Sequence, residues 1–491
     1  MKSAAIDIVA KFDVNLLIPS QNPCTMHGQG YEHHSVWWEG RCVYGRRSVT
    51  ETKEKNFAAS PSPAMALLSP ARPPAAPPLR RWPSAVRRLR TSIVARSSLP
   101  FPPEKAKHYR ELEAAVEAVE RACRLCVDVK KSLLSREGRV LEKNDRTPVT
   151  VADFGVQALI SLELNRLFPS IPLVAEEDSS FLRSSFSSSQ GDEDHSCDSL
   201  VGSVLNAVSG NASCGGKSFT YDIVLGAIDR GGKNAVAFGV EPATYWVLDP
   251  IDGTRGFLRG NDFLYVVGLA LIVEGEIVAG IMGCPNWKND PLAGNSYSCE
   301  SANTTIEASE HGTIMIAHVG CGTWSRKFSD SSGNDAQIYG SWKTCSVDSC
   351  SMVHEARFCI PDSQTWESLP LSCLYSQTVD DASVRDEHQI ILLPTCCGSL
   401  CKYLMVASGR ASIFLLRAKV QPTIKAWDHA VGMICVQEAG GKVTDWKGNQ
   451  LNLAADQVAR RIIFPSGGVL VSNGNIHTEI INLISSSSSV K

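Results

Sequence analysis

The sequence predicts a mixed α/β protein. Two observations carry this prediction. Helical and strand patterns interleave along the chain after residue 104, as they do in mixed α/β proteins. The composition, 43% hydrophobic and 20% charged over 491 residues, is that of a globular chain long enough for two domains.

The first part of this region is predicted to be helical. Apolar residues recur at helical spacing from Tyr109 to Val127 and again from 153 to 168, which predicts two helices. Residues 173–175 then form a short apolar run that predicts a buried strand ending at Glu176. Residues 179–218 are rich in Ser, Gly and Asp and predict a mobile surface insertion.

Strands dominate the following part. Residues 245–248 predict a strand, and 265–273 with 277–282 predict a hairpin. A polar stretch at 286–312 is expected to separate two domains. Beyond it, the expected strands are 313–318, 390–393 and 411–416, and the expected helices are 400–408 and 427–439.

These patterns predict a division into domains. It comprises a disordered N-terminal extension (1–103) with a transit peptide (65–103), an N-terminal α+β domain (104–290), a linker or insertion (291–312), a C-terminal α/β domain (313–485) and a disordered tail (486–491).

Charge is unevenly distributed along the chain. Residues 1–103 carry a net charge of +8, and the rest carries −11. An acidic body argues against binding a nucleic acid polymer, which needs a basic face, and suits an enzyme that gathers cations. No apolar run reaches the ~18 residues of a membrane span, so no membrane partner is expected. The 17 cysteines follow no paired zinc spacing.

The segment 65–103 has the composition of an organelle transit peptide. It contains seven Arg and no Asp or Glu, and it is rich in Ala, Ser and Pro. A generic disordered basic tail is the alternative. We expect a chloroplast protein, with the mitochondrion or the cytoplasm as alternatives.

The run Asp249-Pro-Ile-Asp252-Gly253-Thr254 carries the strongest chemical signal. An apolar strand ends in an acid, and Pro250 forces a turn. Two carboxylates three residues apart, joined by the Ile251 carbonyl, can converge on one point, as a hard cation such as Mg²⁺ requires. Gly253 allows close backbone approach. A plain Asp-Pro turn with Asp252 capping a helix is the alternative.

Three more acids stand at the ends of predicted elements. Glu176 follows a buried strand, and Asp153 and Asp428 open helices. Taken singly, Asp153 fits a capping box with Thr150, and Asp428 fits a favourable carboxylate at a helix start.

Together these motifs resemble the lithium-sensitive, Mg²⁺-dependent phosphatase superfamily. It includes inositol monophosphatases, fructose-1,6-bisphosphatases, inositol polyphosphate 1-phosphatases and 3′(2′),5′-bisphosphate nucleotidases. The order matches: Thr-Val-Ala-Asp153, Val-Ala-Glu176-Glu-Asp, Asp249-Pro-Ile-Asp252-Gly-Thr254 and Trp-Asp428-His-Ala. The resemblance covers residues 104 to 485. It implies the inositol monophosphatase and fructose-1,6-bisphosphatase fold, an α+β layered sandwich in which layers of helices alternate with sheets.

Within the superfamily the chain is most similar to plant 3′(2′),5′-bisphosphate nucleotidases of the plastid type. Arg255-Gly-Phe-Leu-Arg-Gly260 follows the acidic turn, where inositol monophosphatases usually read Thr-Asn-Phe. The resemblance implies that Ser399, Lys402 and Arg417 contact the nucleotide, with one extra residue needed to align Arg417.

The resemblance also implies the metal ligands and the reaction. Two or three Mg²⁺ ions would be held by Glu176, Asp249, the Ile251 carbonyl, Asp252 and Asp428, with assistance from Asp153. Thr254, hydrogen-bonded to Asp153, would activate the attacking water, and Gly253 and Thr254 would contact the substrate. The expected reaction removes the 3′(2′)-phosphate of adenosine 3′(2′),5′-bisphosphate, or of its phosphosulfate analogue.

Two alternatives remain open from the sequence. One is an inositol phosphate phosphatase of the same fold, and the other is a catalytically inactive regulatory member. The expected partner is a small nucleotide bisphosphate, and the chain is expected to be a monomer or a homodimer.

Overall fold

The computed structural model describes residues 98–135, 141–142, 148–188, 200–213, 219–233, 235, 243–259, 263–288, 312–328, 341–371, 391–393, 395, 398–418, 423–453 and 462–488. Its helices are α1 (Tyr109–Ser135), α2 (Val151–Leu167), α3 (Ser180–Ser188), α4 (Leu200–Asn211), α5 (Tyr221–Asp229), α6 (Thr254–Arg259), α8 (Leu400–Ala407), α9 (Ala430–Glu438) and α10 (His477–Ser488). Short 3-10 turns are Pro103–Lys105, Val353–Glu355 and Trp366–Ser368.

The strands form two large sheets and two small pairs. A seven-stranded sheet consists of β3 (Leu173–Ala175), β4 (Tyr245–Asp252), β5 (Val266–Val273), β6 (Glu276–Cys284), β7 (Gly312–His318), β8 (Gly322–Phe328) and β9 (Lys343–Cys345), in that order. A five-stranded sheet has the order β11 (Ile391–Leu392), β10 (Arg357–Cys359), β12 (Ile413–Arg417), β16 (Gly468–Asn473) and β14 (Gly441–Asp445). The pairs are β1 (Leu141–Glu142) with β2 (Pro148–Val149) and β13 (Ile424–Lys425) with β15 (Ile462–Ile463).

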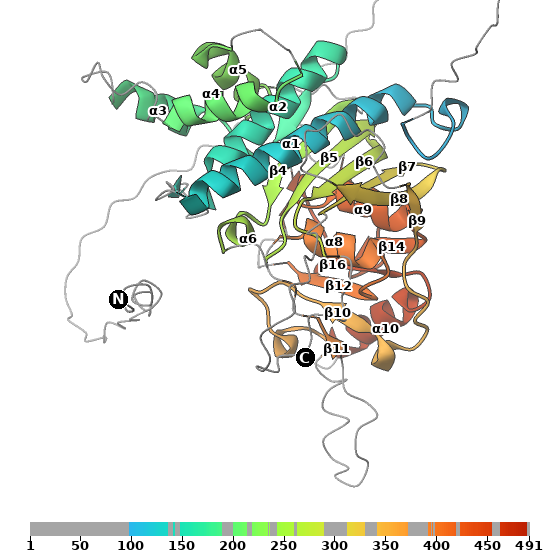
Figure 1. Cartoon of the computed structure of the whole chain (residues 1–491). Coiled ribbons are helices and arrows are strands. Elements are labelled where there is room, and N and C mark those ends of the chain that lie inside the picture. Colours follow the sequence, from blue (N-terminus) through green and yellow to red (C-terminus); the bar gives the residue numbers. More distant parts are fainter. Residues whose placement is uncertain are drawn as a thin grey trace, which may run out of the picture. The chain divides into compact units, whose positions relative to one another are not determined.

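The layers alternate as the sequence predicts (Figure 1). Helices α1 and α2 pack on one face of the seven-stranded sheet, and α8 and α9 pack between its other face and the five-stranded sheet. Helix α10 covers the far side of the five-stranded sheet, next to β16. The α/β fold class and the layered sandwich are therefore confirmed.

Strand alternation explains why this sheet can be covered on both faces. On β5, Leu269 and Leu271 face the core with α1 and α2, whereas Ala270 and Ile272 face the core with α8 and α9. Successive side chains of a strand point to opposite faces. Because both faces are buried, β5 is an apolar run rather than an alternating one.

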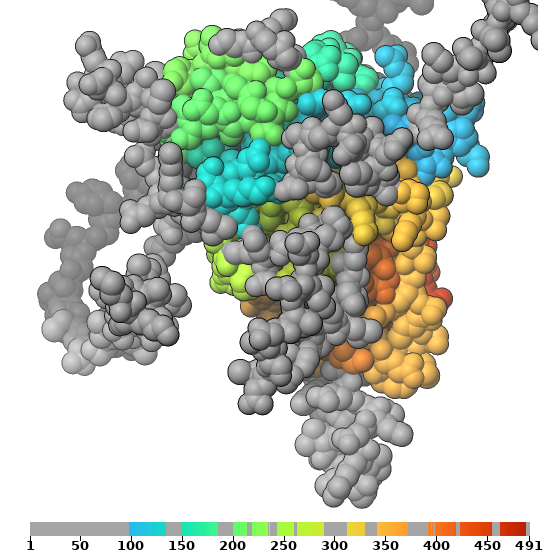
Figure 2. Space-filling model, viewed as in Figure 1, coloured from blue at the N-terminus to red at the C-terminus, as the bar shows by residue number. Residues whose placement is uncertain are grey.

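The segment 179–218 contains more structure than a mobile insertion. It includes α3 and α4, and Val201, Val204 and Val208 of α4 are buried against the α2 residues Phe154 and Ala158. In the space-filling view, the green α4 region lies directly beside α1 in blue (Figure 2). The segment is polar overall, but its valines recur at helical spacing, and their burial against α2 stabilises the helix.

The predicted boundaries differ from the observed elements in two places. Strands β7 to β9 continue the sheet of β3 to β6 across 291–312, while the division into 104–290 and 313–485 stays a prediction. Helix α10 extends to Ser488, into the predicted tail, and Ser486 and Ser487 hydrogen-bond to carbonyls four residues earlier. Residues 1–97, most of 291–312 and 489–491 lie outside the described residues.

Among the described residues, no helix is long and apolar enough to cross a bilayer.

Candidate active site

Strand β4 carries two acids from the core to the edge of a cavity. The strand is buried along its whole length, including Asp249 and Asp252. Its pairing with β5 is regular as far as Asp249, and the register shifts between Asp249 and Asp252. Such an irregularity redirects side chains in a strand. Helix α6 then begins at Thr254.

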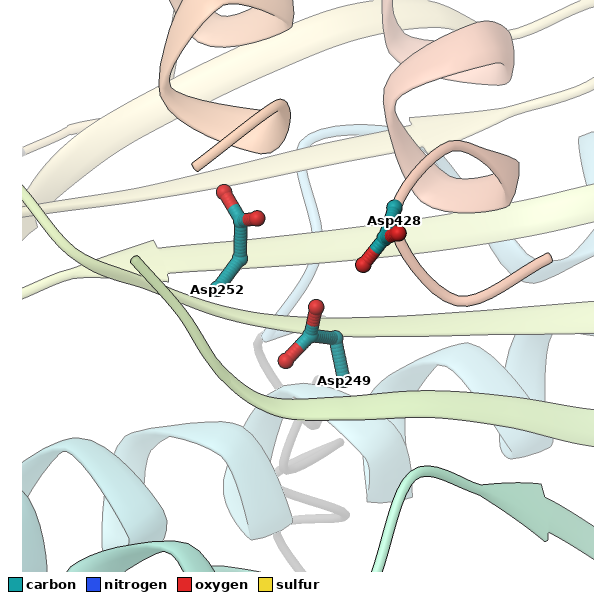
Figure 3. A group of neighbouring side chains, drawn as sticks. All are labelled: Asp249, Asp252 and Asp428. Carbon is teal, nitrogen blue, oxygen red and sulfur yellow. The ribbon is translucent and has the colours of Figure 1, made fainter. Parts of the chain in front are cut away.

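A third acid comes from a distant part of the chain. Asp428 lies just before α9, whose first residue is Ala430. One oxygen from each of Asp249, Asp252 and Asp428 lies within 4.8 Å of the other two. Their carboxylates point toward one another in Figure 3. The structure therefore brings together three of the four carboxylates predicted as metal ligands.

Without a cation, ionising the three carboxylates of this cluster costs free energy. Burial raises the pKa of Asp249, and the nearby carboxylates of Glu176 and Asp252 raise it further. Burial and Asp252 also raise the pKa of Asp428. Burial raises the pKa of Asp252 to about 6, although Lys402 acts in the opposite direction. Buried like charges disfavour the ionised form, so the carboxylates favour protons or a cation.

The donor atoms fit a hard divalent cation. Asp249 Oδ1 is buried and has no hydrogen-bond partner among the described residues, and a buried unpaired acceptor is costly. The available ligands are carboxylate oxygens, with the Ile251 carbonyl nearby. Oxygen-only ligation is typical of Mg²⁺ and Ca²⁺. The cluster can therefore bind a metal ion.

Asp153 and Thr254 form a connected pair beside the cluster. The Thr254 hydroxyl lies 3.3 Å from Asp153 Oδ1 and 3.1 Å from the Ile251 carbonyl oxygen, so its single proton has two acceptors. Thr150 donates to Asp153 Oδ2 from its backbone N–H at 2.8 Å and from its hydroxyl at 2.6 Å. The capping box at Asp153 is therefore present, and the other carboxylate oxygen faces Thr254.

Asp252 joins β4 to the start of α8. Its Oδ1 accepts the Ser399 backbone N–H at 2.9 Å, and its Oδ2 accepts the Leu400 N–H at 2.7 Å. The Lys402 ammonium, 2% exposed as a residue, donates to the Gly398 carbonyl at 2.8 Å. Asp252 thus accepts backbone N–H groups at the start of α8, a helix that is distant in the sequence.

A cavity of about 820 Å³ contains these groups, a volume typical of small-ligand sites. Its lining residues are Glu176, Asp249, Ile251, Asp252, Gly253, Thr254, Arg255, Arg259, Pro361, Asp362, Ser363, Gly398, Ser399, Lys402, Leu416 and Asp428. Every predicted site residue except Asp153 and Arg417 is in this set. Asp153 lies behind Thr254.

Arg417 is not brought into the cavity. Leu416 lines the cavity, whereas the Arg417 guanidinium donates to the Ser368 carbonyl at 2.6 Å. On β12, Ile413 and Leu415 face the core beneath α10, and Phe414 faces the α8 side. Because side chains alternate, Arg417 lies on the same face as Leu415, away from the cavity.

Seven residues of the cavity lining were not predicted from the sequence: Arg255, Arg259, Pro361, Asp362, Ser363, Gly398 and Leu416. The first two had a local signal, because they stand four residues apart directly after the acidic turn. Residues 361–363 had none, since only the pairing of β10 with β12 brings them to this edge.

A family model, "Inositol monophosphatase family", matches residues 226–489, a region that contains Asp249, Asp252 and Asp428. The chain belongs to the inositol monophosphatase family. This membership accounts for the layered fold and agrees with an acidic cluster that can bind a metal.

Relatives in this family are nucleotidases by name. A protein of Arabidopsis thaliana, provisionally named as a mitochondrial 3′(2′),5′-bisphosphate nucleotidase, is 57% identical over 81% of this chain and 92% of its own length. Another from Arabidopsis thaliana, 3′,5′-bisphosphate nucleotidase 2, is 35% identical over 70% of this chain and 88% of its own. Among solved structures, the IMPase of Thermotoga maritima is 18% identical with a TM-score of 0.44, covering 78% of this chain and 99% of its own.

Proposed function

We propose that this family member hydrolyses the 3′(2′)-phosphate of adenosine 3′(2′),5′-bisphosphate to give AMP and phosphate, with Mg²⁺ as the cofactor. The observation that carries the proposal is the convergence of Asp249, Asp252 and Asp428 in a cavity of about 820 Å³. The substrate is supported by the names of the relatives at 57% and 35% identity.

The carboxylates would hold two or three Mg²⁺ ions, and Glu176 and the Ile251 carbonyl would complete the ligand set. Divalent cations in such a site stabilise the negative charge that develops on the phosphate. Because the chain resembles lithium-sensitive phosphatases, we also expect lithium to inhibit the reaction. No cysteine or serine nucleophile is needed.

The protein groups that move the proton would be Thr254 and Asp153. When the Thr254 proton points to Asp153 Oδ1, the hydroxyl oxygen can accept a proton from a water on its cavity side. The Thr254 proton would move to Asp153 Oδ1, while the two hydrogen bonds from Thr150 to Oδ2 hold the Asp153 carboxylate in position. Thr254 would thus orient the attacking water and pass its proton inward.

A substrate panel tests this function. Phosphate release from adenosine 3′,5′-bisphosphate is measured beside release from inositol 1-phosphate and inositol 1,4-bisphosphate, with the phosphosulfate analogue as a fourth substrate. The proposal expects the highest kcat/KM with the adenosine bisphosphate, and only with Mg²⁺ present. A preference for either inositol compound would favour the inositol phosphatase alternative and refute the nucleotidase assignment.

We also propose import into an organelle, with the mitochondrion favoured. The acid-free, Arg-rich segment 65–103 and the mitochondrial name of the 57% identical relative support this. The chloroplast prediction has no support among these relatives. Fusing residues 65–103 to a fluorescent reporter tests the proposal, and a cytosolic or plastid signal would contradict it.

A further inference from the structure

We propose that Arg255 and Arg259 form the subsite for the second phosphate of the substrate, the one that remains after hydrolysis. This inference rests on the proposed function, which requires a substrate with two phosphates. Both arginines belong to α6, directly after the acidic turn, and both line the cavity. Residues four apart lie on one face of a helix, so the two guanidiniums reach the same side.

The third cation of the cavity lining acts on the acidic cluster. Among the described lining residues, the positive side chains are Lys402, Arg255 and Arg259. Lys402 is buried, donates to the Gly398 carbonyl and acts electrostatically on Asp252. It therefore serves the acidic cluster, and the α6 arginines are the remaining cations of the lining that can bind a second phosphate.

The spacing of the two arginines suits an anion that both side chains contact. Like charges four residues apart repel one another on a helix, and Arg255 makes no ion pair within the described part of the chain. The Arg259 guanidinium lies 5.7 Å from the centre of the Phe263 ring, a contact that restrains its position. A phosphate between the guanidiniums would replace their repulsion with charge-assisted hydrogen bonds.

The position of Arg417 strengthens this assignment. The family resemblance gives the nucleotide contact to an arginine of β12, but in this chain Leu416 occupies the cavity side of that strand. Arg417 is bonded to the Ser368 carbonyl instead. The positive charge for the retained phosphate would therefore come from Arg255 and Arg259 of α6, which directly follows the acidic turn.

The test compares substrates with and without the second phosphate. kcat/KM is measured for adenosine 3′,5′-bisphosphate and for adenosine 3′-monophosphate with the wild type, Arg255→Gln, Arg259→Gln and the double variant. Wild type is expected to prefer the bisphosphate, and each substitution is expected to reduce the ratio of the two kcat/KM values by roughly 10- to 100-fold. A Lys at either position should restore part of the ratio, since it keeps the charge without the planar fork.

Arg417→Gln is the matched control, because it removes the same group from a residue outside the cavity. Its ratio should stay at the wild-type value. Thermal unfolding and Mg²⁺ binding show whether each variant is folded, and the single variants carry the test if the double variant is not. An unchanged ratio in the folded Arg255 and Arg259 variants, or a collapsed ratio in Arg417→Gln, would overturn the proposal.

The experiment distinguishes an error in the proposed substrate from an error in the proposed phosphate subsite. If wild type releases phosphate from neither adenosine compound, the nucleotidase function is refuted. The same ratio is then measured with inositol 1,4-bisphosphate against inositol 1-phosphate. A ratio that falls in the α6 variants supports a second-phosphate subsite on this scaffold, and a constant ratio overturns it.

Discussion

At the scale of single residues, the chemistry depends on buried carboxylates that repel one another until a cation binds. Asp249 is the central one, because it is buried, other carboxylates surround it and its Oδ1 has no hydrogen-bond partner among the described residues. The neighbouring acids Glu176 and Glu177 differ in their environment. Glu177 is buried, and its backbone N–H donates to Gln157 Oε1. Glu176 instead lines the cavity.

Replacing Asp249 by Asn should separate stability from activity. The pKa of Asp249 lies above the ordinary value of 3.8 in the folded state, so the metal-free fold loses stability as the pH rises above 3.8. In EDTA at a pH of about 7.5 the Asn variant should therefore be more stable than wild type. Urea unfolding measures this difference.

The same variant should lose both phosphate release and the increase in Tm that Mg²⁺ gives wild type. Asp222→Asn, at an acid of the α5 first turn, is the control, and it should keep both properties. Wild-type turnover in the Asp249→Asn enzyme would contradict the metal assignment.

Mg²⁺ affinity should depend on pH through Asp252. In the metal-free protein its pKa is about 6, so below that pH the cation has to displace a proton. As the pH falls below 6, affinity should fall by about tenfold per pH unit for this one proton. Isothermal titration calorimetry in two buffers of different ionisation enthalpy measures the affinity and the released proton. A constant affinity from about pH 5 to pH 8 would exclude Asp252 as a ligand.

At the scale of elements, the site depends on how β4 meets α8. Gly398, just before the helix, has a φ of +65°, and a Cβ built on it would lie 2.1 Å from Asp252 Oδ2. Only glycine adopts this backbone readily and leaves room for the carboxylate. The backbone at Gly398 thus leaves room for the Asp252 carboxylate.

Gly398→Ala should consequently weaken Mg²⁺ binding as well as the fold. The positive φ costs about 1–3 kcal/mol, and the clash should displace Asp252. Gly320→Ala is the matched control, because its φ is +73° and a Cβ there meets nothing within 4 Å. The control should lose stability but keep its Mg²⁺ affinity, as measured by calorimetry and urea unfolding. Equal affinities in the two variants would refute the role of Gly398.

At the scale of the whole molecule, residues 91–491 form a compact unit. Its described core begins with Leu99 and Phe101, which are buried together with Ala106 against α1. These residues follow most of the basic segment that the sequence assigns to targeting. We therefore expect that targeting and catalysis can be separated along the chain.

Two truncated chains test this separation. A chain that starts at Thr91 should keep the Tm and kcat/KM of the full chain. A chain that starts at Lys107 lacks Leu99, Phe101 and Ala106 and should lose about 2–5 kcal/mol of unfolding free energy. Urea unfolding measures both, and an equally stable shorter chain would show that these contacts do not matter.

The sequence by itself determined the reactive groups and the alternation of helices and strands. Asp249, Ile251, Asp252 and Thr254 are close neighbours in the chain, and a strand that ends in a turn needs no distant partner to be recognised. The apolar run of β5 likewise predicted a buried strand.

Only the tertiary structure decided how distant groups are oriented toward the site. The packing of α9 on the sheet brings Asp428 to Asp249 and Asp252. Alternation on β12 turns Arg417 away and Leu416 inward, which a one-residue difference in register would reverse. The arginines of α6 acquire a role for the same reason, because a charge selects a substrate only when the fold points it into the cavity.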